Sequence, residues 1–368
     1  MANNDELKYW IALSRIPGIG KAKISYLKKH FGNLADAWKA PEGELRYAGL
    51  DSQSASAFVC ARSEISPEDE LSNLERHKIK AFMPEDEDYP ARLKEIHDYP
   101  PVLYVKGELP AEDEFCLAVV GTRRPSSYGC RVTEEIVSAL VQNKATIVSG
   151  LARGIDSIAH RSALENGGRT IAVFACGLDI VYPAENSHLA CSIAEKGALV
   201  SEYPPGVRPR AGNFPLRNRI MSGMSRGVLV IEAREKSGAL ITAFQALEQD
   251  REVFAVPGSI FSPGSKGTNR LIQEGAKLVD KCSDIMEEFN LTTVPRQVAL
   301  EEFVPTNENE VILLKQLTYE PSHIDEICRL SNLDVSQVSS ALAMLEINGR
   351  IKQVGNMNYV LIDKVKIG

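Results

Sequence analysis

The sequence predicts an α/β protein in which a doubly wound parallel sheet is preceded by a helical domain and followed by a winged helix. Six short apolar runs alternate with helical patterns between residues 116 and 256. Nearly continuous apolar strands that alternate with helices of ten or more residues are typical of a parallel sheet covered on both faces. The chain has 368 residues, which is too long for one ordinary core and favours two or three domains.

Composition argues against several classes of protein. A net charge of −7 disfavours a general nucleic-acid coat, although residues 205–220 carry four arginines and no acid. No apolar run is long enough to span a bilayer, so no membrane insertion is expected, and the polar, acidic start favours a cytoplasmic protein. Seven cysteines without CxxC spacing indicate reduced thiols. No His/Cys/Asp cluster has metal spacing, and neither a metal nor a cofactor is expected.

A helical domain is expected over residues 1–80. Apolar positions at helical spacing over residues 5–14, the turn PGIG and a basic helix over Lys21–Phe31 resemble a helix-hairpin-helix or SAM-like unit. In such a hairpin glycine amides approach a phosphate and lysines add positive charge. Possible accessory contacts to a nucleic acid are therefore Gly18, Gly20, Lys21 and Lys23. A packing domain with a solvated basic face is an equally good interpretation.

The main sheet is expected within residues 81–289. A proline-rich lead-in with a strand at Val102–Val105 should pack on its edge. The other strands are expected at Cys116–Val120, Thr146–Ser149, Thr170–Phe174, Leu199–Ser201, Val228–Ile231 and Val253–Val256. Because crossovers between parallel strands are right-handed, the strand-to-helix loops lie at one edge of the sheet. Their glycines permit close backbone approach and their arginines and lysines supply charge, so a polyanion is expected to bind along this edge.

Two stretches carry the strongest binding signals. In the first, SGLARGID, a strand passes into a helix through small residues, and the backbone N–H groups of such a loop receive anions. In the second, NFPLRNRIMSGM, Arg217 and Arg219 flank Asn218 at the head of a helix, and Phe214 is placed to stack on an unpaired base. The alternative is that Phe214 fills the core and the arginines form internal ion pairs. Because arginine at a helix amino end opposes the helix dipole, ligand binding is favoured.

Several enzyme motifs are absent or misplaced. The dinucleotide fingerprint GxGxxG does not occur, and GSKGT at 264–268 misses the Walker spacing. The sequence GMSRG at 223–227 matches the hydrolase pattern GxSxG, but it precedes a strand instead of following one, so we interpret it as chance. Asp156 and His160 share a helix face without a nearby nucleophile, which favours packing roles for both. The chain is not expected to be an enzyme.

Together these motifs resemble the DNA-processing protein A family, also called DprA or Smf. The resemblance rests on GTR at 121–123, SGLARGID with the following AH, YP at 182–183, SE at 201–202, FPLRNR at 214–219, EA with SG at 237–238, and VPG at 256–258. It implies an extended Rossmann-like domain that binds single-stranded DNA without catalysis. It also implies that the protein protects incoming strands during natural transformation, loads the RecA recombinase on them and works as a homodimer. Thr122 keeps a hydroxyl where the family often has serine.

The resemblance also implies which residues contact the DNA. Carried over by matching position, they are Gly121, Thr122, Arg123, Arg124, Ser149, Gly150, Arg153, Phe214, Arg217, Asn218, Arg219, Lys236, Ser237 and Gly238. Lys266 is a further accessory candidate.

A linker is expected at 290–307, and residues 308–368 resemble a winged helix. Helices are expected over 310–318, Ile324–Leu330 and Val335–Asn348, followed by a hairpin of Ile351–Val354 and Tyr359–Ile362. The presumptive recognition helix contains no lysine or arginine, and residues 300–368 carry ten acids against six bases. Because major-groove reading needs cationic or amide donors, this unit is expected to bind protein or to regulate.

A function of a different class is a nucleotide-directed hydrolase that resembles the phosphoribohydrolases. Those enzymes carry a PGGxGTxxE loop with a catalytic glutamate. The equivalent stretch here, EAREKSGALITA, lacks the paired glycines, and Gln245 stands where the acid would be. The single-strand binder is therefore the favoured hypothesis.

Overall fold

The structure, a computed structural model, describes residues 4–110, 113, 115–291, 307–318 and 321–361. The chain divides into two units, Met1–Val294 and Pro295–Gly368. The helical domain and the sheet belong to the same unit, so the boundary expected at residue 80 stays a prediction. Most of the linker expected at 290–307 lies outside the described residues.

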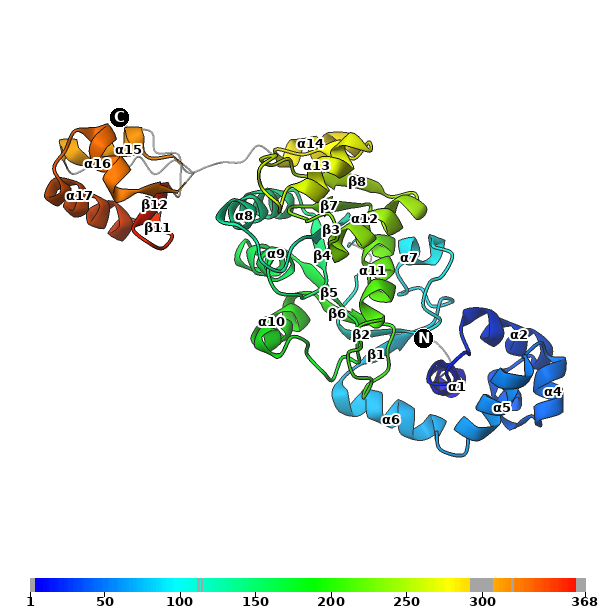
Figure 1. Ribbon diagram of the computed structural model, residues 1–368. Coiled ribbons are helices and arrows are strands. Elements are labelled where there is room, and N and C mark those ends of the chain that lie inside the picture. The colour runs from blue at the N-terminus through cyan, green and yellow to red at the C-terminus, as the bar shows by residue number, and fades with distance from the viewer. Residues whose placement is uncertain (1–3, 111–112, 114, 292–306, 319–320, 362–368) are drawn as a thin grey trace. The chain divides into compact units, whose positions relative to one another are not determined.

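The first unit is organised around a sheet that has nine strands within the described residues (Figure 1). Seven neighbouring strands run parallel in the order β6-β5-β4-β3-β7-β8-β9. Their bounds are β3 (Cys116–Val120), β4 (Thr146–Ser149), β5 (Thr170–Phe174), β6 (Ala198–Ser201), β7 (Gly227–Val230), β8 (Glu252–Ala255) and β9 (Lys277–Leu278). The six strands expected for the main sheet are confirmed to within one residue at each end.

The lead-in packs on the edge of the parallel sheet, as expected, and adds two antiparallel strands to it. The lead-in forms β1 (Lys80–Phe82) and β2 (Leu103–Gly107), separated by the short helix α7 (Ala91–Glu95). Strand β2 pairs antiparallel with β6, placing Tyr104 opposite Ser201, and β1 pairs antiparallel with β2. The lead-in thus extends the sheet at its edge, a common addition to doubly wound folds.

Helices cover both faces of the sheet, and alternate residues of β3 show this. Leu117 and Val119 belong to one apolar core, and Ala118 and Val120 to the core on the opposite face. The first layer contains α8 (Ser127–Gln142), α9 (Ile155–Glu165) and α14 (Cys282–Glu288), with α10 (Ser187–Lys196) beside α9. The second layer contains α7, α11 (Asn213–Met224), α12 (Gly238–Glu248) and α13 (Lys266–Gln273). This arrangement confirms the doubly wound fold.

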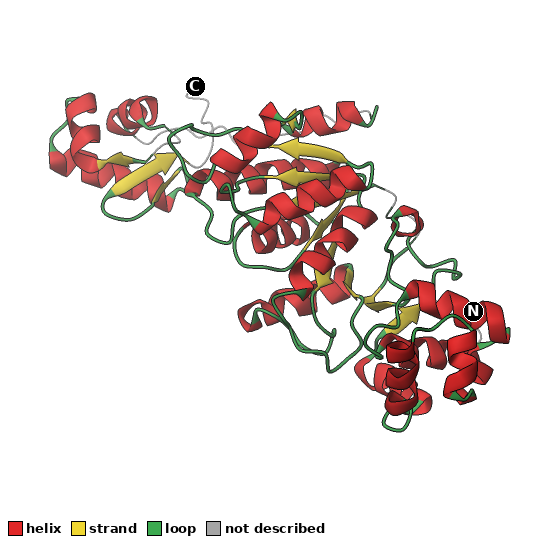
Figure 2. Cartoon of the chain, turned by 45° about the vertical axis from the view of Figure 1, so that its right-hand side comes forward, coloured by secondary structure: helices red, strands yellow, loops and turns green. Residues whose placement is uncertain are grey.

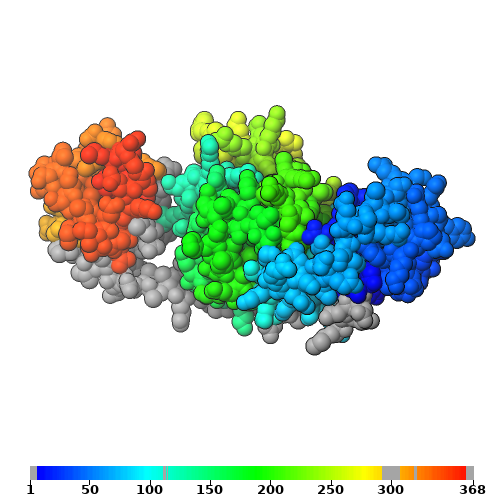
Figure 3. All heavy atoms as spheres, turned by 90° about the horizontal axis from the view of Figure 1, so that it is seen from below, coloured from blue at the N-terminus to red at the C-terminus, as the bar shows by residue number. Residues whose placement is uncertain are grey.

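The N-terminal helices pack directly against the sheet domain. They are α1 (Asn4–Ser14), α2 (Lys21–Phe31), α3 (Leu34–Lys39), α4 (Glu42–Tyr47), α5 (Ser52–Ala61) and α6 (Pro67–His77). Their core is continuous with Tyr104 and Phe174 of the sheet, and the two domains form one surface in the space-filling view (Figure 3). The Arg15 guanidinium donates to the Pro205 carbonyl at 2.8 Å, which fastens the helical domain to the loop after β6.

The second unit is a winged helix. It contains α15 (Glu308–Gln316), α16 (Ile324–Ser331), α17 (Val335–Ile347) and three short strands in the order β10 (Ser322–His323), β12 (Asn358–Leu361), β11 (Ile351–Gln353) (Figure 2). Leu313, Ile327 and Leu342 are buried between the helices. The expected three helices and hairpin are confirmed, and β10 adds a strand to the hairpin. No helix in the described part of either unit has the length and apolar character needed to cross a membrane.

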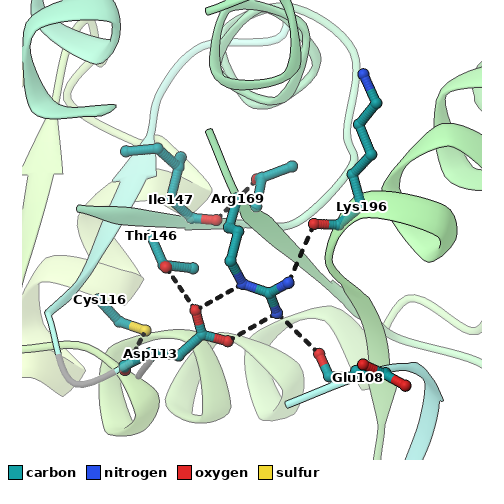
Figure 4. Close-up of polar contacts among 8 residues, drawn as sticks. Glu108, Asp113, Cys116, Thr146, Ile147, Arg169 and Lys196 are labelled. Atoms are coloured by element: carbon teal, nitrogen blue, oxygen red, sulfur yellow. Dashed lines mark hydrogen bonds and ion pairs between the residues drawn. The ribbon is translucent and has the colours of Figure 1, made fainter. Parts of the chain in front are cut away.

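An arginine–aspartate pair closes the amino edge of the parallel sheet (Figure 4). Arg169, just before β5, donates through Nε and Nη2 to the two carboxylate oxygens of Asp113, each at 3.0 Å. The same guanidinium donates to the backbone carbonyls of Glu108 and Lys196, and the Thr146 hydroxyl donates to Asp113 at 2.6 Å. The network therefore ties the segment after β2 to the starts of β4 and β5.

We expect Arg169→Ala to lower the free energy of unfolding by about 2 kcal/mol, because it leaves a buried carboxylate without its cation. Urea unfolding followed by circular dichroism measures this change. The control, Arg270→Ala, breaks an exposed pair with Glu274 and should leave the urea midpoint nearly unchanged. Equal midpoints for Arg169→Ala and the unmodified protein would contradict the structural role of the pair.

Candidate nucleic-acid interface

The candidate site lies where the strand order reverses, between β3 and β7. Such a switch point leaves a crevice at the carboxyl ends of the strands, and doubly wound proteins bind ligands there. A pocket of about 340 Å³ opens at this place. Nine of the predicted contact residues line it: Gly121, Thr122, Arg123, Phe214, Arg217, Asn218, Lys236, Ser237 and Gly238.

An arginine and a second aromatic ring contact Phe214 at the pocket. The guanidinium carbon of Arg123 lies 5.8 Å from the centroid of the Phe214 ring, and the Tyr182 ring lies 5.7 Å from it on a 56° tilt. Arg123 is exposed, Tyr182 is 49% exposed and Phe214 is half-buried. Phe214 thus keeps part of its ring at the surface instead of filling the core. A guanidinium beside accessible rings is suited to a phosphate and an unpaired base.

Arg217 forms part of the pocket floor instead of reaching out of it. Its side chain is buried, and Nη1 donates to the backbone carbonyl of Val173. Burial lowers the pKa of Arg217 to about 10, and the carboxylate of Asp156 opposes this shift. The predicted contact of Arg217 with a ligand phosphate stays a prediction, and the structure places this side chain at the floor of the pocket. Its charge acts from beneath the pocket and offsets that of Asp156.

Two other predicted arginines also have internal partners. Arg219 is buried between Glu202, at 2.5 Å from Nη2, and Asp98, at 3.0 Å from Nε. These ion pairs fit the alternative of internal pairing for Arg219, and its predicted contact with a ligand stays a prediction. Arg153 forms a two-bond contact with Glu185, both distances 2.7 Å, but both side chains stay largely exposed. An exposed pair is weak, so Arg153 can exchange Glu185 for another anion.

The loop between β4 and α9 receives a carboxylate of the protein itself. The backbone amides of Gly150 and Ala152 donate to one Asp156 oxygen at 3.1 and 3.4 Å, and the Ser149 hydroxyl donates to the Val119 carbonyl. Burial raises the pKa of Asp156, although Arg217 opposes this. The Ser149 hydroxyl and the Gly150 amide are bonded within the protein, and the expected contact of these two residues with DNA stays a prediction.

The helix residues Asp156 and His160 are packing residues, as expected. Both are buried, and the His160 Nδ1 atom lies 2.6 Å from the Thr170 hydroxyl, which itself donates to the Ile147 carbonyl. Burial lowers the pKa of His160 to about 3. The imidazole is therefore neutral at physiological pH and enclosed by the fold.

Glu232, directly after β7, orders the loop between β3 and α8, although the sequence did not mark it as a site residue. Its buried carboxylate accepts from the Ser126 amide at 2.9 Å and from the Ser126 hydroxyl at 2.6 Å. The Thr122 amide donates to the Glu232 carbonyl at 2.8 Å. These bonds fix both ends of the loop, and Arg123 and Arg124 are exposed between them. In the sequence, the one feature that could have identified Glu232 is its position as an acid directly after an apolar run predicted to be a strand.

The loop between β7 and α12 supplies the opposite wall of the pocket. Lys236 and Gly238 are exposed, and the Ser237 hydroxyl caps α12 by accepting from the Ala239 amide at 3.3 Å. Asn218 is buried, and its amide donates to the Gly238 carbonyl at 3.4 Å, which joins α11 to this loop. Arg234 also lines the pocket and is exposed, a cation that sequence reasoning missed.

The accessory lysines of the helical domain are engaged within the protein. Lys21 donates to the His97 carbonyl at 3.2 Å and lies 3.3 Å from the centroid of the Tyr99 ring. Lys23 pairs with Asp51 at 2.7 Å. Both amines are paired with groups of the protein, and the expectation that these lysines add phosphate contacts beside Gly18 and Gly20 stays a prediction. Lys266 in the sheet domain remains exposed, 4.0 Å from Glu235.

The chain combines a doubly wound sheet with a winged helix, and the sheet has a cationic, aromatic pocket at its switch point. These features define a class of Rossmann-like anion-binding proteins. Comparison with known families identifies the family within this class. The family described as DNA recombination-mediator protein A matches residues 80–290, and the DprA winged helix domain matches residues 304–357. The chain belongs to the DNA recombination-mediator protein A family.

Individual relatives agree with this assignment. Protein Smf of Synechocystis is 36% identical and covers 97% of this chain and 99% of its own length. The DNA processing protein DprA of Bacillus subtilis is 48% identical over 55% of this chain and 68% of its own length. The crystal structure of DprA from Streptococcus pneumoniae superposes with a TM-score of 0.68 at 38% identity, covering 78% of this chain and 98% of that one.

A structure from Helicobacter pylori is also similar. It gives insights into the single-stranded DNA binding mode of DNA processing protein A, and it superposes with a TM-score of 0.53 at 31% identity. The match covers 58% of this chain and 96% of that one.

We expect Gly150→Ala to destabilise the protein by about 1–3 kcal/mol, because the new Cβ would collide with the buried Arg217 guanidinium. Thermal unfolding measures the effect. Gly212→Ala is the matched control, since a Cβ at Gly212 meets nothing within 4 Å. If both variants melt together with the unmodified protein, Arg217 is not held as the structure describes.

Proposed function

We propose that the chain is a non-catalytic, single-stranded DNA-binding recombination mediator. It protects incoming strands during natural transformation, loads the RecA recombinase on them, and acts in the cytoplasm as a homodimer. Family membership and the DNA binding described for the Helicobacter pylori relative support this proposal. It is the function that combines the matched family with the chemistry of the pocket.

The observation that carries the proposal is the exposed cation beside accessible aromatic rings at the switch point. Arg123 offers a guanidinium fork to a phosphate, and Phe214 and Tyr182 offer ring surface to an unpaired base. In a duplex the bases are paired and stacked inside, out of reach of such rings. The arrangement therefore favours single strands over double strands.

The proposed site residues fall into two groups, those accessible to the strand and those engaged within the protein. Direct contacts with the strand are Gly121, Thr122, Arg123, Arg124, Arg153, Phe214, Lys236, Ser237 and Gly238. Arg217, Asn218, Asp156 and Glu232 position these groups from within the protein.

Among the described residues that line the pocket, no acid is suited to the hydrolase alternative. Asp156 lines it, but the carboxylate is buried and bonded to two backbone amides. Gln245, at the position of the phosphoribohydrolase glutamate, donates its amide to the Pro215 carbonyl at 3.0 Å and braces α11. These partners support binding over catalysis.

A filter-binding assay with single- and double-stranded oligonucleotides of one sequence, run across a salt series, tests the proposal. We expect a preference for the single strand and a steep loss of affinity as salt rises, because phosphate neutralisation releases counterions. Cleavage of nucleoside monophosphates with no strand binding would support the hydrolase instead.

We expect Arg123→Ala to weaken strand binding by about tenfold and to reduce the salt slope by about one. Arg46→Ala is the control, because it removes an equal charge from an exposed position in α4 and should bind as the unmodified protein does. Equal affinities for Arg123→Ala and Arg46→Ala would remove Arg123 from the interface.

A further inference from the structure

The loop between β8 and α13 exposes two adjacent apolar side chains at the carboxyl edge of the sheet. Ile260 is 76% exposed, and Phe261, at 89%, is the most exposed large apolar side chain among the described residues. Single exposed apolar residues are common, but two bulky neighbours at a loop tip leave a large area of unfavourable hydration. The glycines and the lysine of the loop VPGSIFSPGSKGTN do not explain why these two side chains are exposed.

The base of this loop is firmly bonded. The Asn269 side chain exchanges two hydrogen bonds with the backbone of Gly258, at 2.9 and 3.1 Å. The Gly264 carbonyl accepts from the Ala233 amide at 2.8 Å, and the Ala233 carbonyl accepts from the Gly267 amide at 2.8 Å. These hydrogen bonds, which we call the frame of the loop, hold the base of the tip between Ser259 and Gly264 in place. The exposure of the apolar residues at the tip therefore does not result from fraying of the loop.

The frame connects the tip to both walls of the candidate site. Ala233, to which the loop is bonded, directly precedes Arg234 of the pocket wall. On the other side, the Tyr128 hydroxyl donates to the Pro257 carbonyl at 2.7 Å, next to the loop that carries Arg123 and Arg124. A strand that leaves the pocket along this edge would reach the tip.

Charge around the tip matches such a strand. Arg234 and Lys236 are exposed on the adjoining loop between β7 and α12, and Lys266 is exposed at the start of α13. The acid nearest to Lys266 is Glu235, 4.0 Å away and itself exposed, so the pair is weak. Cations that flank an exposed ring reproduce the combination of phosphate and base contacts seen in single-strand grooves.

We propose that Ile260 and Phe261 form a second base-stacking station, in which Phe261 stacks on an unpaired base beyond the pocket and Lys266 faces a neighbouring phosphate. This inference rests on the proposed function and extends it from one pocket to a track along the sheet edge. Two side chains are too small a surface for a stable protein interface, which buries at least about 1,200 Å². A nucleic-acid base, whose stacking area one ring can cover, is the better-matched occupant.

Fluorescence anisotropy with oligothymidylates of two lengths, about 4 and about 16 nucleotides, tests this proposal with the full chain. The short strand fills only the pocket, whereas the long one reaches the tip. We expect Phe261→Ala to weaken binding of the long strand by about tenfold and to leave the short strand within twofold, since stacking is lost at one base. Phe261→Trp should restore binding, and the new indole fluorescence should be quenched by the long strand alone.

Tyr47→Ala is the matched control, because it removes an aromatic ring that is 84% exposed on α4. It should leave both affinities unchanged. Light scattering of each variant without DNA accompanies the titrations.

The outcomes separate this inference from the proposed function. If the unmodified protein binds neither strand, both are overturned. If it binds both strands and Phe261→Ala matches it at each length, the second station is overturned and the pocket stands. If Phe261→Ala instead halves the molar mass in light scattering, the tip contacts a second copy of the chain, and the stacking role is likewise overturned.

Discussion

The candidate interface depends on one buried electrostatic contact, that of Asp156 with the amides of its loop and with the charge of Arg217. Neither side chain is more than 6% exposed, and a buried charge is tolerated only when hydrogen bonds and an opposite charge offset its lost hydration. Asp156 receives the amides of Gly150 and Ala152, and Arg217 donates to Val173 at the end of β5. The contact thereby fixes α11 against the carboxyl ends of β4 and β5, and α11 in turn holds Phe214 at the pocket.

This constraint divides the arginines of the central domain into two groups with different roles. Arg217 and Arg219 are buried and offset the charge of internal carboxylates, so they shape the site from within the protein. Arg123, Arg124 and Arg234 are exposed on loops that the buried contacts hold in place. An acidic protein can therefore present a local cationic surface, because local charge, not net charge, decides where a polyanion binds.

The sequence was informative where a local pattern decides the structure. Uninterrupted apolar runs such as Cys116–Val120 become strands because a sheet covered on both faces buries every residue. For α11, which is buried on several sides, the residue types alone do not show which side chains face the solvent and which face the core. The sequence predicts a ligand contact for Arg217 and Arg219, and in the structure both are buried together with Ile220, Met221 and Met224. Glu232 was missed because its partner, Ser126, is 106 residues away in sequence, a proximity that only the folded sheet creates.

Photochemical cross-linking of a bound oligonucleotide, followed by mass spectrometry of the attached peptides, tests the central claim most directly. A strand lying at the switch point should cross-link to the aromatic residues there, Phe214 and Tyr182, and should do so less as salt rises. Cross-links confined to the winged helix or to the N-terminal helices would contradict the account, because they would place the strand away from the carboxyl edge of the sheet.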